Sequence, residues 1–76
     1  MSAISDRVLT ISKPYLGPAT ESFLSRQCKS HLNTEMTSLD AGHIRELAKW
    51  VEVGAGLIMA PAKASELAKK IAALSA

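Results

Sequence analysis

The stretch YLGPATESFLSRQ, residues 15–27, decides how the chain folds because it contains both a corner and the start of a helix. Proline is favoured at the first position of a helix, where its missing N–H is not needed. Glycine adopts the backbone angles that a tight junction between helices demands. We therefore expect a corner at Gly17 and a helix that begins at Pro18 and runs through Leu32.

The residues before this corner follow a helical pattern. Spacings of four, three and four residues place the apolar side chains on one face, namely Ile4, Val8, Ile11 and Tyr15. Pro14 has no N–H to donate, and it disfavours helical angles at the residue before it. A first helix is therefore expected from Ser2 to about Ser12, where it ends or kinks.

A third helix is expected from about Asp40 to Met59, with Asp40 or Ser38 as its N-cap. His43 stands where Glu or Gln would complete a capping box, so none is predicted there. Helical spacing predicts the core stripe Ile44, Leu47, Ala48, Val51, Ala55 and Ile58. Gly54 lies beside this stripe, and its poor helix propensity indicates close approach of a neighbouring helix, the second or the fourth.

Pro61 restarts the chain as Pro18 does, and the helix after it presents one apolar face: Ala64, Leu67, Ala68, Ile71 and Leu74. No stretch alternates in the manner of a strand. The predicted fold class is all-α: a compact four-helix bundle with short connections, a single domain over residues 1–76, and the third helix at its centre.

Charge and composition narrow the class of protein. Nine basic and seven acidic residues are interspersed, giving a net charge of +2. The single cysteine excludes an internal disulfide. The first ten residues lack the basic and apolar regions of a signal peptide, and the longest apolar stretch has about half the length of a membrane span. A cytoplasmic protein without membrane contact is expected.

A polar set shares the apolar face of the second helix: Thr20, Gln27, Cys28 and His31. Such residues either line a small-ligand pocket or form a satisfied buried network, and the network is favoured because most buried polar groups are paired. The spacing of Cys28, His31 and His43 fits no common zinc site. No nucleophile has a base and an orienting group beside it. We expect no metal, no cofactor and no enzymatic activity.

Two kinds of surface are candidates for binding. A protein partner would bind at either of two candidate interaction surfaces, the corner with Tyr15 and Leu16 or the flank of the third helix with Trp50, Val53 and Leu57. Tryptophan is frequent at such sites, although Trp50 and Leu57 equally fit a core at the flank. Nucleic-acid binding is the less favoured alternative, because the basic clusters are small: Arg26 with Lys29, and Lys63 with Lys69 and Lys70.

Two segments also resemble known helical modules. The first, YLGPA at residues 15–19, is similar to the Y-hydrophobic-G-P-A opening of modules attached to bacterial signalling proteins, serine/threonine kinases among them. The second, HIRELAKWVEVGAGLI at residues 43–58, resembles the second half of stand-alone bacterial helical domains. The resemblance implies a non-catalytic protein–protein interaction or regulatory module. A second copy of the chain is one candidate partner.

Overall fold

The computed structural model describes residues 3–75, and every regular element in this range is helical. In chain order they are α1 (Ala3–Leu16), a 3₁₀ turn (Gly17–Ala19), α2 (Thr20–Gln27), a π-helical turn (Cys28–Leu32), 3₁₀ turns at Met36–Ser38 and Ala41–His43, α3 (Ile44–Ala55), α4 (Pro61–Ala72) and a last 3₁₀ turn (Ala73–Ser75). The predicted all-α class is confirmed. The predicted start of the first helix, Ser2, lies outside the described residues.

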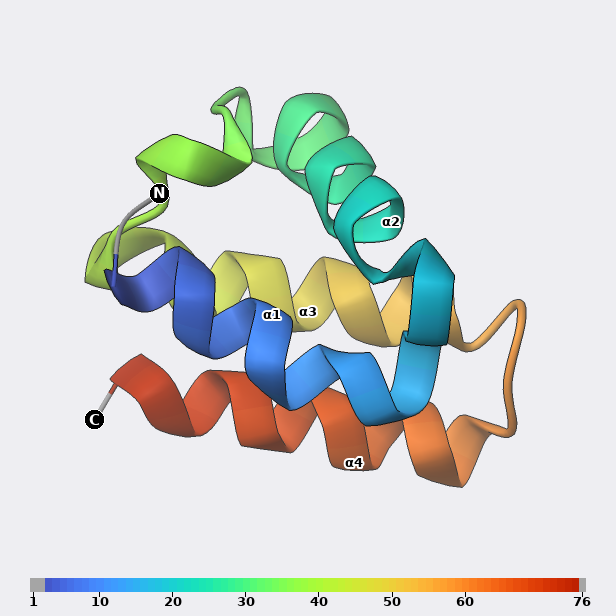
Figure 1. The fold of residues 1–76 in the computed structure, drawn as a ribbon. Helices are drawn as coiled ribbons and strands as arrows, with labels where there is room; N and C mark the ends of the chain where they lie inside the picture. Colours follow the sequence, from blue (N-terminus) through green and yellow to red (C-terminus); the bar gives the residue numbers. More distant parts are fainter. Residues whose placement is uncertain (1–2, 76) are drawn as a thin grey trace.

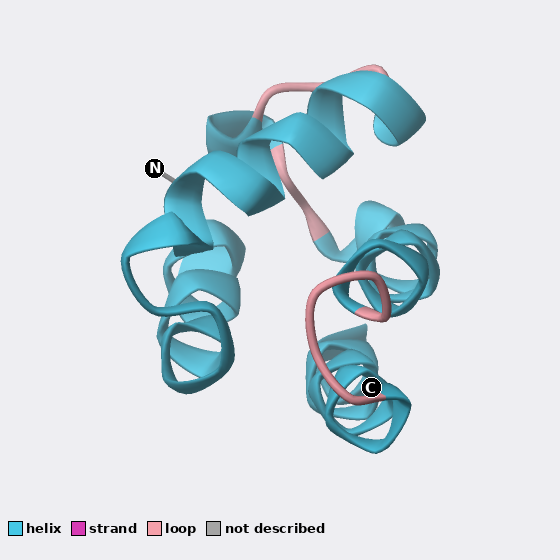
Figure 2. Ribbon diagram, turned by 90° about the vertical axis from the view of Figure 1, so that its right-hand side faces the viewer, coloured by secondary structure: helices cyan, strands magenta, loops and turns pink. Residues whose placement is uncertain are grey.

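Three long helices, α1, α3 and α4, form the body of the molecule (Figure 1), and Figure 2 looks along them to show the second helical segment crossing on one side. This segment consists of a 3₁₀ turn, the eight-residue α2 and the π turn. The prediction of a four-helix bundle is therefore wrong. α3 packs against both α4 and the second helical segment, and α4 packs against α1 as well. The molecule is compact and measures 29 × 24 × 20 Å.

The corner after α1 forms where it is predicted, but α1 is longer than predicted. It continues through Pro14 to Leu16 instead of ending near Ser12. Pro14 lies in the last turn and deprives only the carbonyl of Thr10 of its helical donor. Because Thr10 is exposed, water can bind that carbonyl. Gly17 then adopts a φ of +59°, the left-handed conformation that ends many helices.

Two serines occupy the centre of the buried face of α1. Of the predicted apolar stripe only Val8 is fully buried, and its other members are half-buried at the edges of this face. The buried residues are Ser5, Val8, Ser12 and Leu16. Ser5 Oγ donates a hydrogen bond to the carbonyl of Met36 and so ties α1 to the Met36–Ser38 turn. Ser12 Oγ is equally buried but has no hydrogen-bond partner in the described part of the chain. Small side chains here let α1 approach its neighbours closely.

A capping box precedes α3, although the residue types do not predict one. The N–H of Gly42 donates to Asp40 Oδ1 at 2.8 Å, and the N–H of Asp40 donates to His43 Nδ1 at 3.2 Å. A neutral imidazole nitrogen accepts a hydrogen bond as the side chain of Glu or Gln would. His43 therefore completes the box in place of those residues, which corrects the prediction.

α3 ends at Ala55, four residues before the predicted end at Met59. The core stripe as far as Ala55 is buried as predicted, and so is the apolar face of α4 except for the half-buried Leu74. Ile58 is not in the core: it lies in the turn after α3 with 64% of its surface exposed. The early end of α3 thus moves a predicted core residue to the surface.

The two buried serines of α1 provide a matched pair for a stability test. Ser12→Ala removes a buried hydroxyl that has no partner, so we expect the free energy of unfolding to rise by about 1 kcal/mol. Ser5→Ala removes the hydrogen bond to Met36, so we expect it to fall by about 1 kcal/mol. Urea denaturation followed by circular dichroism measures both. A change of the same sign in both variants would contradict these roles.

Candidate functional site

The main candidate site is a groove of about 350 Å³ between α2 and the end of α3. Its first wall comes from the 3₁₀ turn and α2: Ala19, Ser22, Phe23, Arg26 and Gln27. Its second wall comes from α3 and the turn that follows: Gly54, Leu57 and Ile58. We call this feature the α2–α3 groove.

Gly54 allows α2 and α3 to lie this close together. A Cβ atom built at Gly54 would lie 3.0 Å from Gln27 Nε2 and 3.1 Å from Phe23 Cζ, closer than most Cβ contacts, so these two side chains would have to shift by a few tenths of an ångström. The close approach predicted for Gly54 is confirmed, and the neighbour is the second helix, through side chains rather than its backbone. Without a side chain at this position, the ring of Phe23 can lie directly over α3.

Large exposed apolar side chains of residues 3–75 lie at or next to this groove. Val53, Leu57 and Ile58 are 56%, 85% and 64% exposed, and two of them line the groove. Val53 and Leu57 belong to the predicted interaction surface. Ile58 was missed because helical periodicity places it in the core. The two glycines at positions 54 and 56 were the available signal that α3 ends early, since glycine disfavours helix interiors.

The other members of the predicted interaction surface are buried or half-buried. Leu16 is only 9% exposed and belongs to the core, so its assignment to a surface is wrong. Tyr15 is half-buried, and Lys70 Nζ lies 5.1 Å from its ring centroid. Trp50 is half-buried, and its ring stacks on His31 with centroids 3.9 Å apart and planes 6° apart. These residues do not extend the groove into a larger patch.

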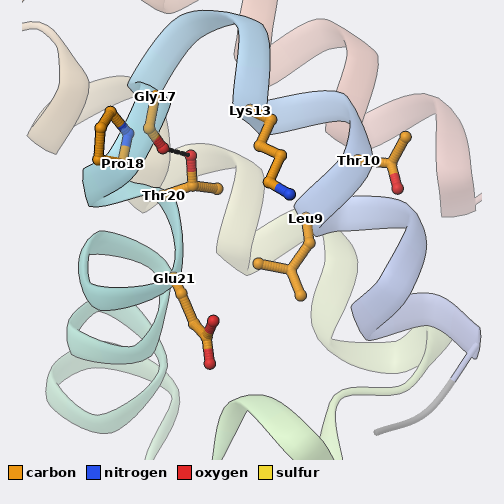
Figure 3. A pocket seen from close by; sticks show the side chains of 7 residues that line it. All are labelled: Leu9, Thr10, Lys13, Gly17, Pro18, Thr20 and Glu21. Carbon is orange, nitrogen blue, oxygen red and sulfur yellow. Dashed lines mark hydrogen bonds between the residues drawn. The ribbon is translucent and has the colours of Figure 1, made fainter.

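The predicted polar set does not come together as one site. Thr20, Gln27 and Cys28 are buried, but His31 is exposed and stacked on Trp50, which corrects its assignment to a buried network. Thr20 Oγ1 donates to the carbonyl of Gly17 at 2.6 Å, a bond within its own corner (Figure 3). Burial raises the pKa of the Cys28 thiol, and the charge of Glu35 raises it further.

Figure 3 shows a second, smaller pocket of about 190 Å³ where α1 meets the corner. Leu9 and Lys13 line it from α1, and Pro18 and Glu21 line it from the other side. Lys13 and Glu21 carry opposite charges but form no ion pair with each other among the described residues. The pocket contains no member of the predicted ligand site except Thr20.

The basic residues considered for nucleic-acid binding are divided between two regions. Arg26 and Lys29 belong to the second helical segment, whereas Lys63, Lys69 and Lys70 belong to α4, on the far side of the molecule (Figure 1). Lys29 pairs with Glu35 at 3.7 Å, and two lysines of α4 pair with Glu66, each at 3.8 Å.

Tyr15 lies beside the α4 ion pairs, and its hydroxyl is the first cause that lowers the pKa of Glu66, ahead of the charges of Lys63 and Lys70. The same hydroxyl raises the pKa of Lys70. Through its ion pairs with two lysines, Glu66 balances part of the positive charge of α4. The basic residues do not form one continuous basic face.

No protein-family model matches the chain, and no curated protein or solved structure is significantly similar to it. The resemblance to modules of bacterial signalling proteins therefore stays a prediction. Residues 3–75 contain no group of three or more His, Cys, Asp or Glu side chains placed to hold a metal ion. Within the same range no helix has both the length and the apolar character needed to cross a membrane.

Trp50 is the single tryptophan, so its fluorescence reports on the stack with His31. We expect His31→Ala to shift the emission maximum to longer wavelength, because one face of the indole loses its cover and meets water. Lys29→Ala, two residues away, is the matched control and should leave the emission unchanged. An unchanged maximum in His31→Ala would contradict the stack.

The buried thiol of Cys28 should react only when the protein unfolds. Its raised pKa keeps the thiolate fraction below that of a free cysteine, and burial blocks access. We expect slow reaction with a thiol-specific disulfide reagent in mildly alkaline buffer and rapid reaction in guanidinium chloride. A native reaction as fast as that of free cysteine would show that Cys28 is accessible.

Proposed function

We propose that the chain is a non-catalytic protein–protein interaction module that binds its partner in the α2–α3 groove. The observation that carries the proposal is the clustering of exposed Leu57 and Ile58 beside a groove walled by Phe23. Exposed apolar side chains gathered in one place are typical of interaction sites. A regulatory role in a bacterial signalling system rests on the resemblance of residues 15–19 and 43–58 alone.

Burial by a partner is the physical reason for this proposal. Fully burying a leucine or isoleucine side chain contributes about 1.5–3 kcal/mol relative to leaving it in water. Leu57 and Ile58 together could therefore supply much of the stabilisation of a moderate complex. Neither residue contributes much of that area to the fold itself, because both are mostly exposed.

Nucleic-acid binding and small-ligand binding have weaker support. The first would need basic residues on a common face, but α2, which carries Arg26, and α4 lie on opposite sides of the molecule (Figure 1), and Glu35 and Glu66 partly balance the lysines. The second would need Thr20, Gln27, Cys28 and His31 around one cavity, but His31 lies elsewhere. The protein-binding proposal requires neither arrangement.

The proposal predicts that Leu57→Asp separates binding from stability. Because Leu57 is 85% exposed, we expect the free energy of unfolding to change by less than about 0.5 kcal/mol. Proteins that can be cross-linked to the immobilised wild-type chain should not be captured by the immobilised Leu57→Asp variant. Ala62→Asp, at an exposed position of α4, makes a similar charge change away from the groove and should retain them. If Leu57→Asp captures the same proteins as Ala62→Asp, the proposal is contradicted.

A further inference from the structure

The backbone around the α2–α3 groove restricts the kind of partner that fits. Both walls are built on helices and short turns, and residues 3–75 contain no strand whose free edge could pair with an extended peptide. An extended segment entering the groove would leave its own N–H and C=O groups without such partners. A helix satisfies these groups internally and can place an apolar stripe in a groove. The groove therefore favours a helical occupant.

The charge of the groove comes from a single residue. Arg26 is the one ionisable side chain in its lining, and among the described residues it forms no ion pair. The lining otherwise consists of apolar, small or uncharged polar residues. The exposed guanidinium of Arg26 attracts a carboxylate and repels an ammonium group, so it selects partners by charge.

A second copy of the chain fits this groove less well. In a two-fold dimer the same patch of both copies meets itself. The lining contains no carboxylate, so the patch itself could not supply Arg26 with an opposite charge. The occupant that complements the groove is instead a different protein.

From these observations we infer that the partner is an amphipathic helix with an acidic side chain beside its apolar stripe. The apolar stripe contacts Phe23, Leu57 and Ile58, and the acidic side chain pairs with Arg26. This inference rests on the proposed function, because it names the partner of the same groove. Gln27, at the base of the groove beside Gly54, offers a second polar group to the same helix.

The test uses two fluorescein-labelled synthetic peptides. Both are amphipathic helices with leucine at positions i, i+3, i+4 and i+7, and they differ only in a flanking residue, glutamate in one and lysine in the other. Fluorescence anisotropy measures the affinity of each for the wild-type chain and for Arg26→Glu. We expect the wild-type chain to bind the glutamate peptide about tenfold more tightly, and Arg26→Glu to reverse the preference.

A matched control removes the effect of overall charge. Lys69→Glu makes the same charge reversal on α4, where the lysine is exposed and forms no ion pair within residues 3–75. It should preserve the preference of the wild-type chain. If Lys69→Glu reverses the preference as Arg26→Glu does, the selection comes from net charge and the inference is overturned.

Peptide binding by the Leu57→Asp variant shows whether only the inference about an acidic partner fails or the proposed function fails too. If Leu57→Asp abolishes binding but the two peptides bind the wild-type chain equally, the groove binds protein and the acidic partner is wrong. If Leu57→Asp has no effect on the binding of either peptide, the proposed function fails as well. A dimer in light scattering that Leu57→Asp dissociates would place a second copy in the groove and overturn the inference.

Discussion

The left-handed backbone at Gly17 is the constraint on which the position of α2 depends. With a φ of +59°, this residue ends α1 and redirects the chain so that α2 crosses the long helices. A residue with a side chain is strained in this conformation, by roughly 1–2 kcal/mol. Thr20 reinforces the corner because its hydroxyl bonds the Gly17 carbonyl. The crossing brings Phe23 over Gly54, and the α2–α3 groove is the space left beside that contact.

The close packing of the three long helices uses small buried residues as well as large ones. Ser5 and Ser12 occupy the buried face of α1, while alanines 64 and 68 do so on α4. Such residues contribute little apolar area, but they let neighbouring helices approach, and close packing is what gives protein interiors their density. A small domain has a thin margin of stability. The leucines and isoleucines that remain buried must therefore supply most of the stabilisation.

The early end of α3 links the fold to the candidate site. If the helix continued to Met59, Ile58 would follow the buried stripe of Val51 and Ala55. Instead the chain turns after Ala55, and Leu57 and Ile58 point into solvent. Exposing them leaves apolar surface in water, which favours any partner able to cover it. The same turn carries the chain to Pro61, where α4 begins.

Local chemistry in the sequence determined the helical class, the corner at Gly17, the helical turn that contains Pro18 and leads into α2, the start of α4 at Pro61, and the buried stripes of α3 and α4. These features depend on hydrophobic periodicity and on the backbone preferences of glycine and proline. Both act over a few neighbouring residues, so they can be predicted from the sequence. The capping box of Asp40 and His43 is also local, but a pattern of residue types that expects Glu or Gln does not predict it. Only the tertiary structure decided that His31 stacks on Trp50. It also decided which apolar side chains stay uncovered. A periodic pattern shows that Ile58 is apolar and on which face of a helix it would lie, whereas its exposure depends on where α3 ends and on what packs beside it.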